Sequence, residues 1–213
     1  MSLRCASVPS YLPFLGRICL VGLFACCALL PAPANAQGWT FPEARPEWEK
    51  FALGFVGGIA GHELGHYLVA TSKGYEVHFD GPTLVYSGAD LSGADQLQVA
   101  SAGFQAQWIL TELVLRDRDW RESKSPPGNF GAGVVCAHLG ITFAYLTFLK
   151  NHKQGDVTGM AEASGFSKNQ IAATLAVPAV LDAWRLFGNQ VPGWVSHVSL
   201  LGKGVGIAWV WTF

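Results

Sequence analysis

Long apolar segments separated by short polar segments dominate the chain. The first after the N-terminal region, residues 51–71, contains no lysine, arginine or aspartate, and its glutamate and two histidines fall within five consecutive positions, His62-Glu63-Leu64-Gly65-His66. Four more apolar segments follow, at residues 97–115, 130–149, 170–187 and 194–213. Segments of about 20 apolar residues are long enough to cross a bilayer as helices. The pattern therefore predicts a mainly α-helical, polytopic membrane bundle of about four to five spans.

The polar segments between these helices predict the remaining local structure. Residues 75–79 and 83–86 are rich in β-forming side chains and flank Asp80-Gly81-Pro82, which favours a turn. We therefore expect a small β-hairpin directly after the first helix. Residues 150–168 are polar and predict a loop, and Pro178 predicts a bend or a break in the fourth helix.

The N-terminal region has the features of a secretory signal. Arg4 and Arg17 precede an apolar stretch at residues 18–30, and Ala34-Asn35-Ala36 is typical of a cleavage site. An uncleaved signal anchor is the alternative. We expect residues 1–36 to be this signal and residues 37–213 to form a single membrane-embedded domain, carried by the secretory route into a bacterial inner membrane.

The overall composition agrees with a membrane location and narrows the class of partner. Half of the residues are hydrophobic and 14% are charged, against about a quarter in soluble domains. A formal charge of -1 and the lack of a basic patch with interleaved aromatic residues exclude nucleic acid as an expected partner. The expected partners are the lipid bilayer and a membrane-protein or peptide substrate.

The H-E-x-x-H motif predicts a metal site. On a helix, His62 and His66 lie one turn apart on the same face, so both rings can bind a single Zn²⁺. Glu63 can then accept a proton from a metal-bound water. The alternative is a pair of packed histidines beside a hydrogen-bonded glutamate. Ionisable groups are costly inside an apolar helix and usually functional there, which favours the zinc site.

The cysteines limit how else a metal could be held. Cys5, Cys19, Cys26 and Cys27 lie in the predicted signal, which leaves only Cys136 in the predicted domain. A single cysteine cannot form a disulfide within the domain or a thiolate-rich structural zinc site. We therefore expect histidine and carboxylate ligands, which are typical of catalytic zinc.

A catalytic zinc site needs a third protein ligand besides the two histidines, and an open position for water. Asp156 is the first candidate, because it follows the third predicted helix on the side where the first helix ends. Glu112 and His138, inside the second and third predicted helices, are alternatives. Each has a structural alternative as well: Asp156 as a solvated loop or N-cap residue, Glu112 as a partner of Arg116, and His138 as a packed histidine.

Two segments resemble the site-2 protease family of intramembrane zinc metallopeptidases. Gly61-His62-Glu63-Leu64-Gly65-His66, followed by Leu68-Val69-Ala70 and Gly74, resembles the first signature of that family. Ala102-Gly103-Phe104-Gln105-Ala106-Gln107 is similar to its later A-G-P-x-x-N stretch, with Phe in place of Pro and Gln in place of Asn. Asp156 is the nearest match to the aspartate of the family's L-D-G motif.

This resemblance implies an intramembrane zinc metalloprotease that hydrolyses peptide bonds of membrane-associated substrates. The implied zinc ligands are His62, His66 and Asp156. Glu63 is the implied general base, and Gln107 or Gln105 would donate a hydrogen bond to the substrate backbone or the oxyanion.

Two functions from other classes stay open. One is a membrane metal-binding or transport protein, in which Glu112, His138 and Asp182 would continue an ion path through the other helices. The other is a catalytically silent, protease-like scaffold. Replacement of Glu63 by glutamine separates the three functions. Loss of proteolysis with zinc retained would indicate the protease, unchanged function the scaffold, and altered metal flux without cleavage the transport protein.

Overall fold

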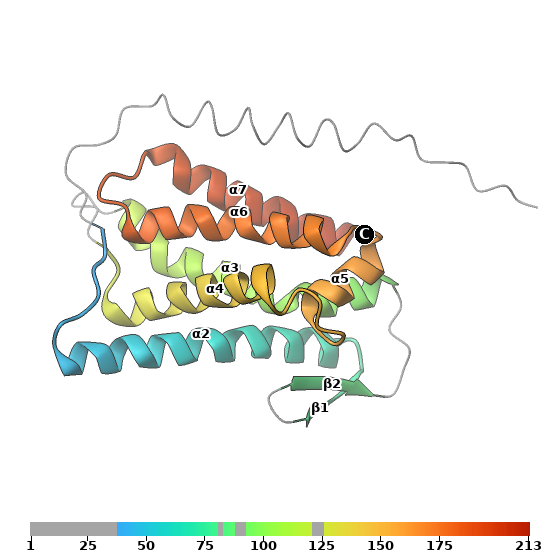
Figure 1. The fold of residues 1–213 in the computed structure, drawn as a ribbon. Coiled ribbons are helices and arrows are strands. Elements are labelled where there is room, and N and C mark those ends of the chain that lie inside the picture. Colours follow the sequence, from blue (N-terminus) through green and yellow to red (C-terminus); the bar gives the residue numbers. More distant parts are fainter. Residues whose placement is uncertain (1–37, 81–82, 88–92, 121–125) are drawn as a thin grey trace, which may run out of the picture. The chain divides into compact units, whose positions relative to one another are not determined.

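The computed structural model describes residues 38–80, 83–87, 93–120 and 126–213. Within these residues the chain is mainly helical, with helices α2 to α7 and one pair of antiparallel strands (Figure 1). The prediction of a mainly α-helical fold is therefore confirmed. The predicted signal, residues 1–36, lies outside the described residues.

Five long helices correspond to the five predicted apolar segments, and a short sixth helix, α5, lies between α4 and α6. The bounds are α2 (Arg45–Ser72), α3 (Gly93–Trp120), α4 (Asn129–Thr147), α5 (Asp156–Ser164), α6 (Lys168–Phe187) and α7 (Gly193–Thr212). The prediction that residues 150–168 form a loop was wrong, because Val157, Met160 and Ala161 give α5 an apolar face that packs into the core. Helix α6 continues through Pro178 without a break.

Glycines allow α2 and α4 to approach each other closely. A β-carbon on Gly54 would meet the backbone of Phe130, and one on Gly58 would lie 2.6 Å from the β-carbon of Ala137. Residue numbers rise in the same direction along both contact surfaces, so α2 and α4 are parallel neighbours (Figure 1). Small residues at four-residue spacing pack helices in this way.

The strands β1 (Glu76–Asp80) and β2 (Thr83–Ser87) follow α2 directly. Gly74 begins this connection with a φ of 83°, a left-handed conformation that suits glycine at the end of a helix. The strands pair in antiparallel register, with Val77 opposite Tyr86. This pair lies beside the end of α2 that carries the histidines.

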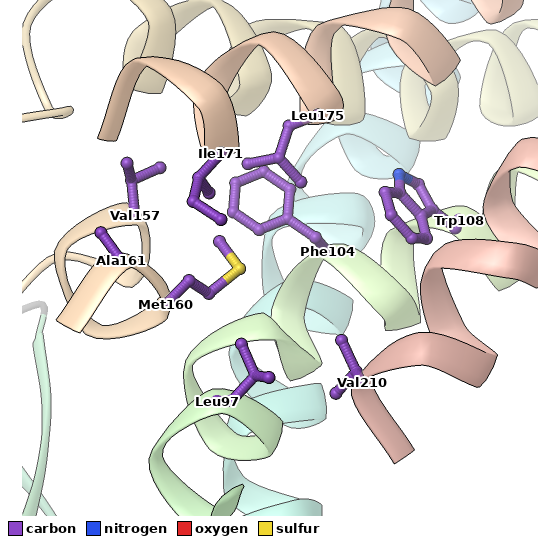
Figure 2. Packing of buried hydrophobic residues seen from close by; sticks show 9 residues of the cluster. All are labelled: Leu97, Phe104, Trp108, Val157, Met160, Ala161, Ile171, Leu175 and Val210. Atoms are coloured by element: carbon purple, nitrogen blue, oxygen red, sulfur yellow. The ribbon is translucent and has the colours of Figure 1, made fainter. Parts of the chain in front are cut away.

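The principal core cluster joins α3 to α5, α6 and α7. Figure 2 shows the Phe104 ring of α3 pointing towards Ile171 and Leu175 of α6. The other members of this cluster are Leu97, Trp108, Val157, Met160, Ala161 and Val210. The cluster holds α5 against α3 and so fixes the position of its first residue, Asp156.

The long helices expose large apolar side chains and enclose charged ones. On α2, Leu53 and Val56 are 65% and 61% exposed, whereas Asp182, Arg185 and Lys203 are buried. By length and composition, one described helix, α4, is long and apolar enough to cross a membrane. The predicted number of four to five spans is not supported by that criterion.

Candidate metal centre

His62 and His66 lie on the inner face of α2, and both are buried. Their Nε2 atoms are 3.2 Å apart. Oδ2 of Asp156 is 3.0 Å from Nε2 of His62 and 3.3 Å from Nε2 of His66. The three residues that the sequence selected as metal ligands are therefore brought together, and their nearest atoms form an almost equilateral triangle.

Different contacts orient the two histidine rings. Nδ1 of His66 lies 2.7 Å from the backbone oxygen of Val99, a carbonyl that can only accept, so this nitrogen carries a proton and donates the hydrogen bond. The His62 ring packs edge-on against Phe104, with ring centroids 5.2 Å apart. Nδ1 of His62 has no hydrogen-bond partner among the described residues.

Asp156 is the first residue of α5, directly after the N-cap Gly155. Its backbone N–H donates to the Tyr145 hydroxyl at 3.3 Å. Burial alone would raise the pKa of the Asp156 carboxyl, but the rings of His66 and His62 lower it well below its usual range. Asp156 therefore presents an ionised carboxylate to both rings.

Gly103 of α3 leaves open the space in front of these nitrogens. A β-carbon on Gly103 would lie 2.6 Å from both Cε1 and Nε2 of His62, and it would also meet Nε2 of His66. Any other residue would therefore push a side-chain carbon against both candidate metal-binding nitrogens. The glycine falls within the segment that resembles A-G-P-x-x-N.

The donor atoms fit a zinc ion in both chemistry and spacing. Two imidazole nitrogens and one carboxylate oxygen are a common ligand set of catalytic zinc. Bond lengths of about 2.0–2.1 Å in a tetrahedral arrangement separate the ligand atoms by roughly 3.3 Å, close to the edges of this triangle. Lone pairs at such short separations repel each other unless a cation or a proton lies between them.

A cavity of about 510 Å³ opens beside the three candidate ligands. Glu63 lines it together with the ligands, as the motif predicted, and residues 152–154 of the α4–α5 connection line another part of its wall. Tyr86 of β2 also lines the cavity. Burial raises the pKa of the Tyr86 hydroxyl, and the charges of Asp156 and Glu63 raise it further. Its hydroxyl therefore keeps its proton and can donate a hydrogen bond into the cavity.

Tyr86 was not selected from the sequence. It occurred there only as one β-forming residue of a short strand, and nothing in its local spacing connects it with the histidines 20 or more positions earlier. The signal that was present is the alternation of a strand, which turns every second side chain to the same side. Which side faces a cavity depends on how the strand packs, and the sequence alone does not give that.

The two glutamines predicted to bind substrate do not line the cavity. Gln107 is buried in α3, and neither polar atom of its amide has a hydrogen-bond partner among the described residues. The amide of Gln105 donates to Oγ of Ser101 and accepts from Nε1 of Trp211, each at 2.8 Å. The structure therefore does not bring either glutamine to Glu63.

The alternative third ligands belong to a separate ion network. Arg185 donates two hydrogen bonds to the Glu112 carboxylate, at 2.6 and 3.0 Å. Lys203 lies 2.6 Å from both Glu112 and Asp182. Nε2 of His138 is 3.9 Å from Oδ2 of Asp182. Glu112 is thus held by cations of α6 and α7, and the sequence did not predict this pairing.

The support for the candidate metal centre comes from the residues of this chain. The described part of the chain provides three candidate ligands, an adjacent glutamate, a glycine that leaves space beside the candidate ligand atoms, and a cavity. Comparison with known proteins found no matching family model, no similar curated protein and no similar solved structure.

Proposed function

We propose that the chain is an intramembrane zinc metalloprotease, which hydrolyses peptide bonds of membrane-associated substrates. The observation that carries this proposal is the triangle formed by Nε2 of His62, Nε2 of His66 and Oδ2 of Asp156, next to Glu63 at the wall of a cavity. A metal-binding structural site needs neither the adjacent glutamate nor the cavity.

The proposed chemistry assigns a role to each residue around the cavity. His62, His66 and Asp156 would hold the zinc, which supplies a Lewis acid that polarises the scissile carbonyl and acidifies a water molecule. Glu63 accepts the proton of the attacking water and passes it to the leaving amine. Tyr86, protonated and facing the cavity, donates a hydrogen bond to the carbonyl oxygen as negative charge develops on it.

The cavity volume is compatible with a peptide substrate in an extended form. A transmembrane helix already satisfies its own backbone groups, so it must unwind locally before a peptide bond can reach Glu63. The cavity, at about 510 Å³, has room for a few residues of an unwound segment.

Five membrane spans, α2, α3, α4, α6 and α7, are part of the proposal. Helices α6 and α7, the shortest after α4, each have 20 residues, and 20 residues span about 30 Å. Leu53 and Val56 on α2, and Leu200 and Leu201 on α7, are largely exposed, which suits contact with lipid. Extraction of membranes with alkaline carbonate tests this part, because a chain with several spans stays in the membrane fraction.

The transport alternative receives less support. An ion path needs carboxylates that are available to the moving ion, whereas Glu112 and Asp182 are paired with Arg185 and Lys203. The scaffold alternative predicts that Glu63 is dispensable, and the following experiment separates it from the protease.

Detergent-purified protein tests the function through zinc content and cleavage. We expect about one zinc per chain in the wild type and in Glu63→Gln, and cleavage of quenched-fluorescence transmembrane peptides by the wild type only. Asp156→Asn should lose the zinc, whereas Glu162→Gln, a carboxylate of the same cavity wall, should keep it. Wild-type protein that contains no zinc after preparation with excess zinc, or undiminished cleavage by Glu63→Gln, would refute the proposed protease function.

A further inference from the structure

Several buried polar atoms between α2, α3 and α4 have no role in the proposed reaction. Among the described residues, five side chains of these helices contain such atoms without a hydrogen-bond partner: His62 (Nδ1), Gln107 (Nε2 and Oε1), His138 (both ring nitrogens), Thr142 (Oγ1) and Trp108 (Nε1), the last of which packs in the principal core cluster. A buried polar atom without a partner destabilises the folded protein. A group of them on neighbouring helices therefore calls for a common explanation.

On α3, Gln107 lies between the metal centre and the ion network. Gly103, Gln107 and Thr111 are four residues apart, so they share one face of the helix and follow one another at about 6 Å. Gly103 faces the rings of His62 and His66. Oγ1 of Thr111 accepts a hydrogen bond from Lys203 at 3.1 Å. The amide of Gln107 is thus one turn from each of them.

On α4, His138 lies, like Gln107 on α3, between the metal centre and the ion network. Its ring is close enough to interact electrostatically with both His62 and Asp182. Nε2 of His138 is 3.9 Å from Oδ2 of Asp182, which is too long for a direct hydrogen bond. Gln107 on α3 and His138 on α4 thus each lie between the metal centre and the ion network.

The two histidines among the candidate metal ligands differ at their second nitrogen. Nδ1 of His66 is bonded to the carbonyl of Val99, whereas Nδ1 of His62 has no partner among the described residues. A metal-binding histidine almost always donates its second nitrogen to a carboxylate, a carbonyl or a water molecule. Internal water bonds polar groups that direct contacts leave unsatisfied.

We propose that Gln107 and His138 are positioning residues of His62. Through internal water they supply the hydrogen bond of Nδ1 of His62, and they connect the metal centre with the network of Glu112, Asp182, Arg185 and Lys203. The inference rests on the proposed metal centre and deepens it. In this arrangement Gln107 acts on a metal ligand, and not on the substrate as the sequence predicted.

Zinc affinity of detergent-purified protein, measured by competition with a chromophoric chelator, tests the proposal. We expect Gln107→Leu and His138→Phe to bind zinc about 10–100-fold more weakly, because an oriented second partner contributes that much to metal affinity. His138→Gln retains hydrogen-bonding groups and should recover most of the affinity. Gln105→Leu is the matched control, since Gln105 is also buried in α3 but bonds to Ser101 and Trp211.

A second measurement does not depend on zinc. The imidazole ¹⁵N shifts of His62 in the metal-free protein should change in Gln107→Leu and stay at their wild-type values in Gln105→Leu. If the wild type binds zinc and monodisperse Gln107→Leu and His138→Phe bind it equally well, the inference is overturned while the proposed function stands. If the wild type binds no zinc, the proposed function fails, and unchanged His62 shifts in Gln107→Leu overturn the inference separately.

Discussion

Gly103 of α3 faces His62 of α2 so closely that a β-carbon on the glycine would lie 2.6 Å from Nε2 of the ring. Glycine is therefore needed here for space, and not for an unusual backbone conformation, since Gly103 lies within a regular helix.

Replacement of Gly103 by alanine should weaken zinc binding. The added methyl group must displace His62 or His66, and we expect an affinity loss of about 10–100-fold, as for other disturbances of ligand orientation. Competition with a chelator measures the loss. Gly57→Ala on α2 is the control, because a β-carbon there would meet nothing within 4 Å. Equal affinities of the two variants would contradict the assigned role of Gly103.

Replacement of Tyr86 by phenylalanine should slow peptide cleavage without removing zinc. Loss of one donor to a developing oxyanion costs roughly 10²-fold in rate. Because burial and the charges of Asp156 and Glu63 raise the pKa of Tyr86, its hydroxyl stays protonated beyond the ordinary tyrosine value of about 10. The wild-type rate should therefore show no decline from this group up to about pH 10.

The control for that variant is Tyr75→Phe, since the Tyr75 hydroxyl donates to Asp95 at 2.8 Å and does not line the cavity. Cleavage rates measured across the alkaline range distinguish the two tyrosines. Cleavage by Tyr86→Phe at the wild-type rate would exclude the hydrogen bond from Tyr86.

Replacement of Lys203 by methionine should destabilise the fold strongly. Lys203 is buried and contacts both Glu112 and Asp182, so its loss leaves buried negative charge with less compensation. Breaking a buried ion pair in this way costs about 3–5 kcal/mol of unfolding free energy. Denaturant titration in detergent measures it. Arg45→Met removes an exposed pair with Glu49 and should cost under about 1 kcal/mol.

Replacement of Gly133 by alanine should separate α2 from α4. A β-carbon on Gly133 would collide with the backbone of Phe51 and lie 2.7 Å from the backbone nitrogen of Phe55. Overpacking of this kind costs about 1–3 kcal/mol, which the midpoint of thermal unfolding reports. Gly140→Ala on the same helix is the comparison, since its β-carbon would make only ordinary contacts with the Phe55 ring. Two variants of equal stability would show that the α2–α4 contact tolerates a methyl group.

Local spacing predicted the parts of the fold that depend on neighbouring residues. The apolar segments predicted the long helices, and the four-residue spacing of His62 and His66 predicted rings on one face of α2. Asp156 was selected through its order along the chain and a family resemblance, and the structure brings it to both histidines. Whether these residues bind zinc stays a prediction.

Features that depend on packing between distant segments were not predicted. Helix α5 is short, and its apolar face becomes stable only against α3 and α6. The pairing of Glu112 with Arg185 joins residues 73 positions apart, and the nearby Arg116 was the only partner that spacing suggested. Gln107 was assigned to the substrate because a motif gives a residue's identity but not the direction of its side chain.

The separation of Asp156 from His62 by 94 positions determines when the metal centre can form during biosynthesis. A nascent chain that has produced α2 holds both histidines but lacks the carboxylate, which joins them only when α5 has been synthesised and packs against α3. If the proposed site binds zinc, acquisition of the metal would be a late step, and a truncated or misassembled chain would remain without it. Metal occupancy would therefore report completed assembly of the protein, and hydrolytic activity would be withheld until the helices enclose the site.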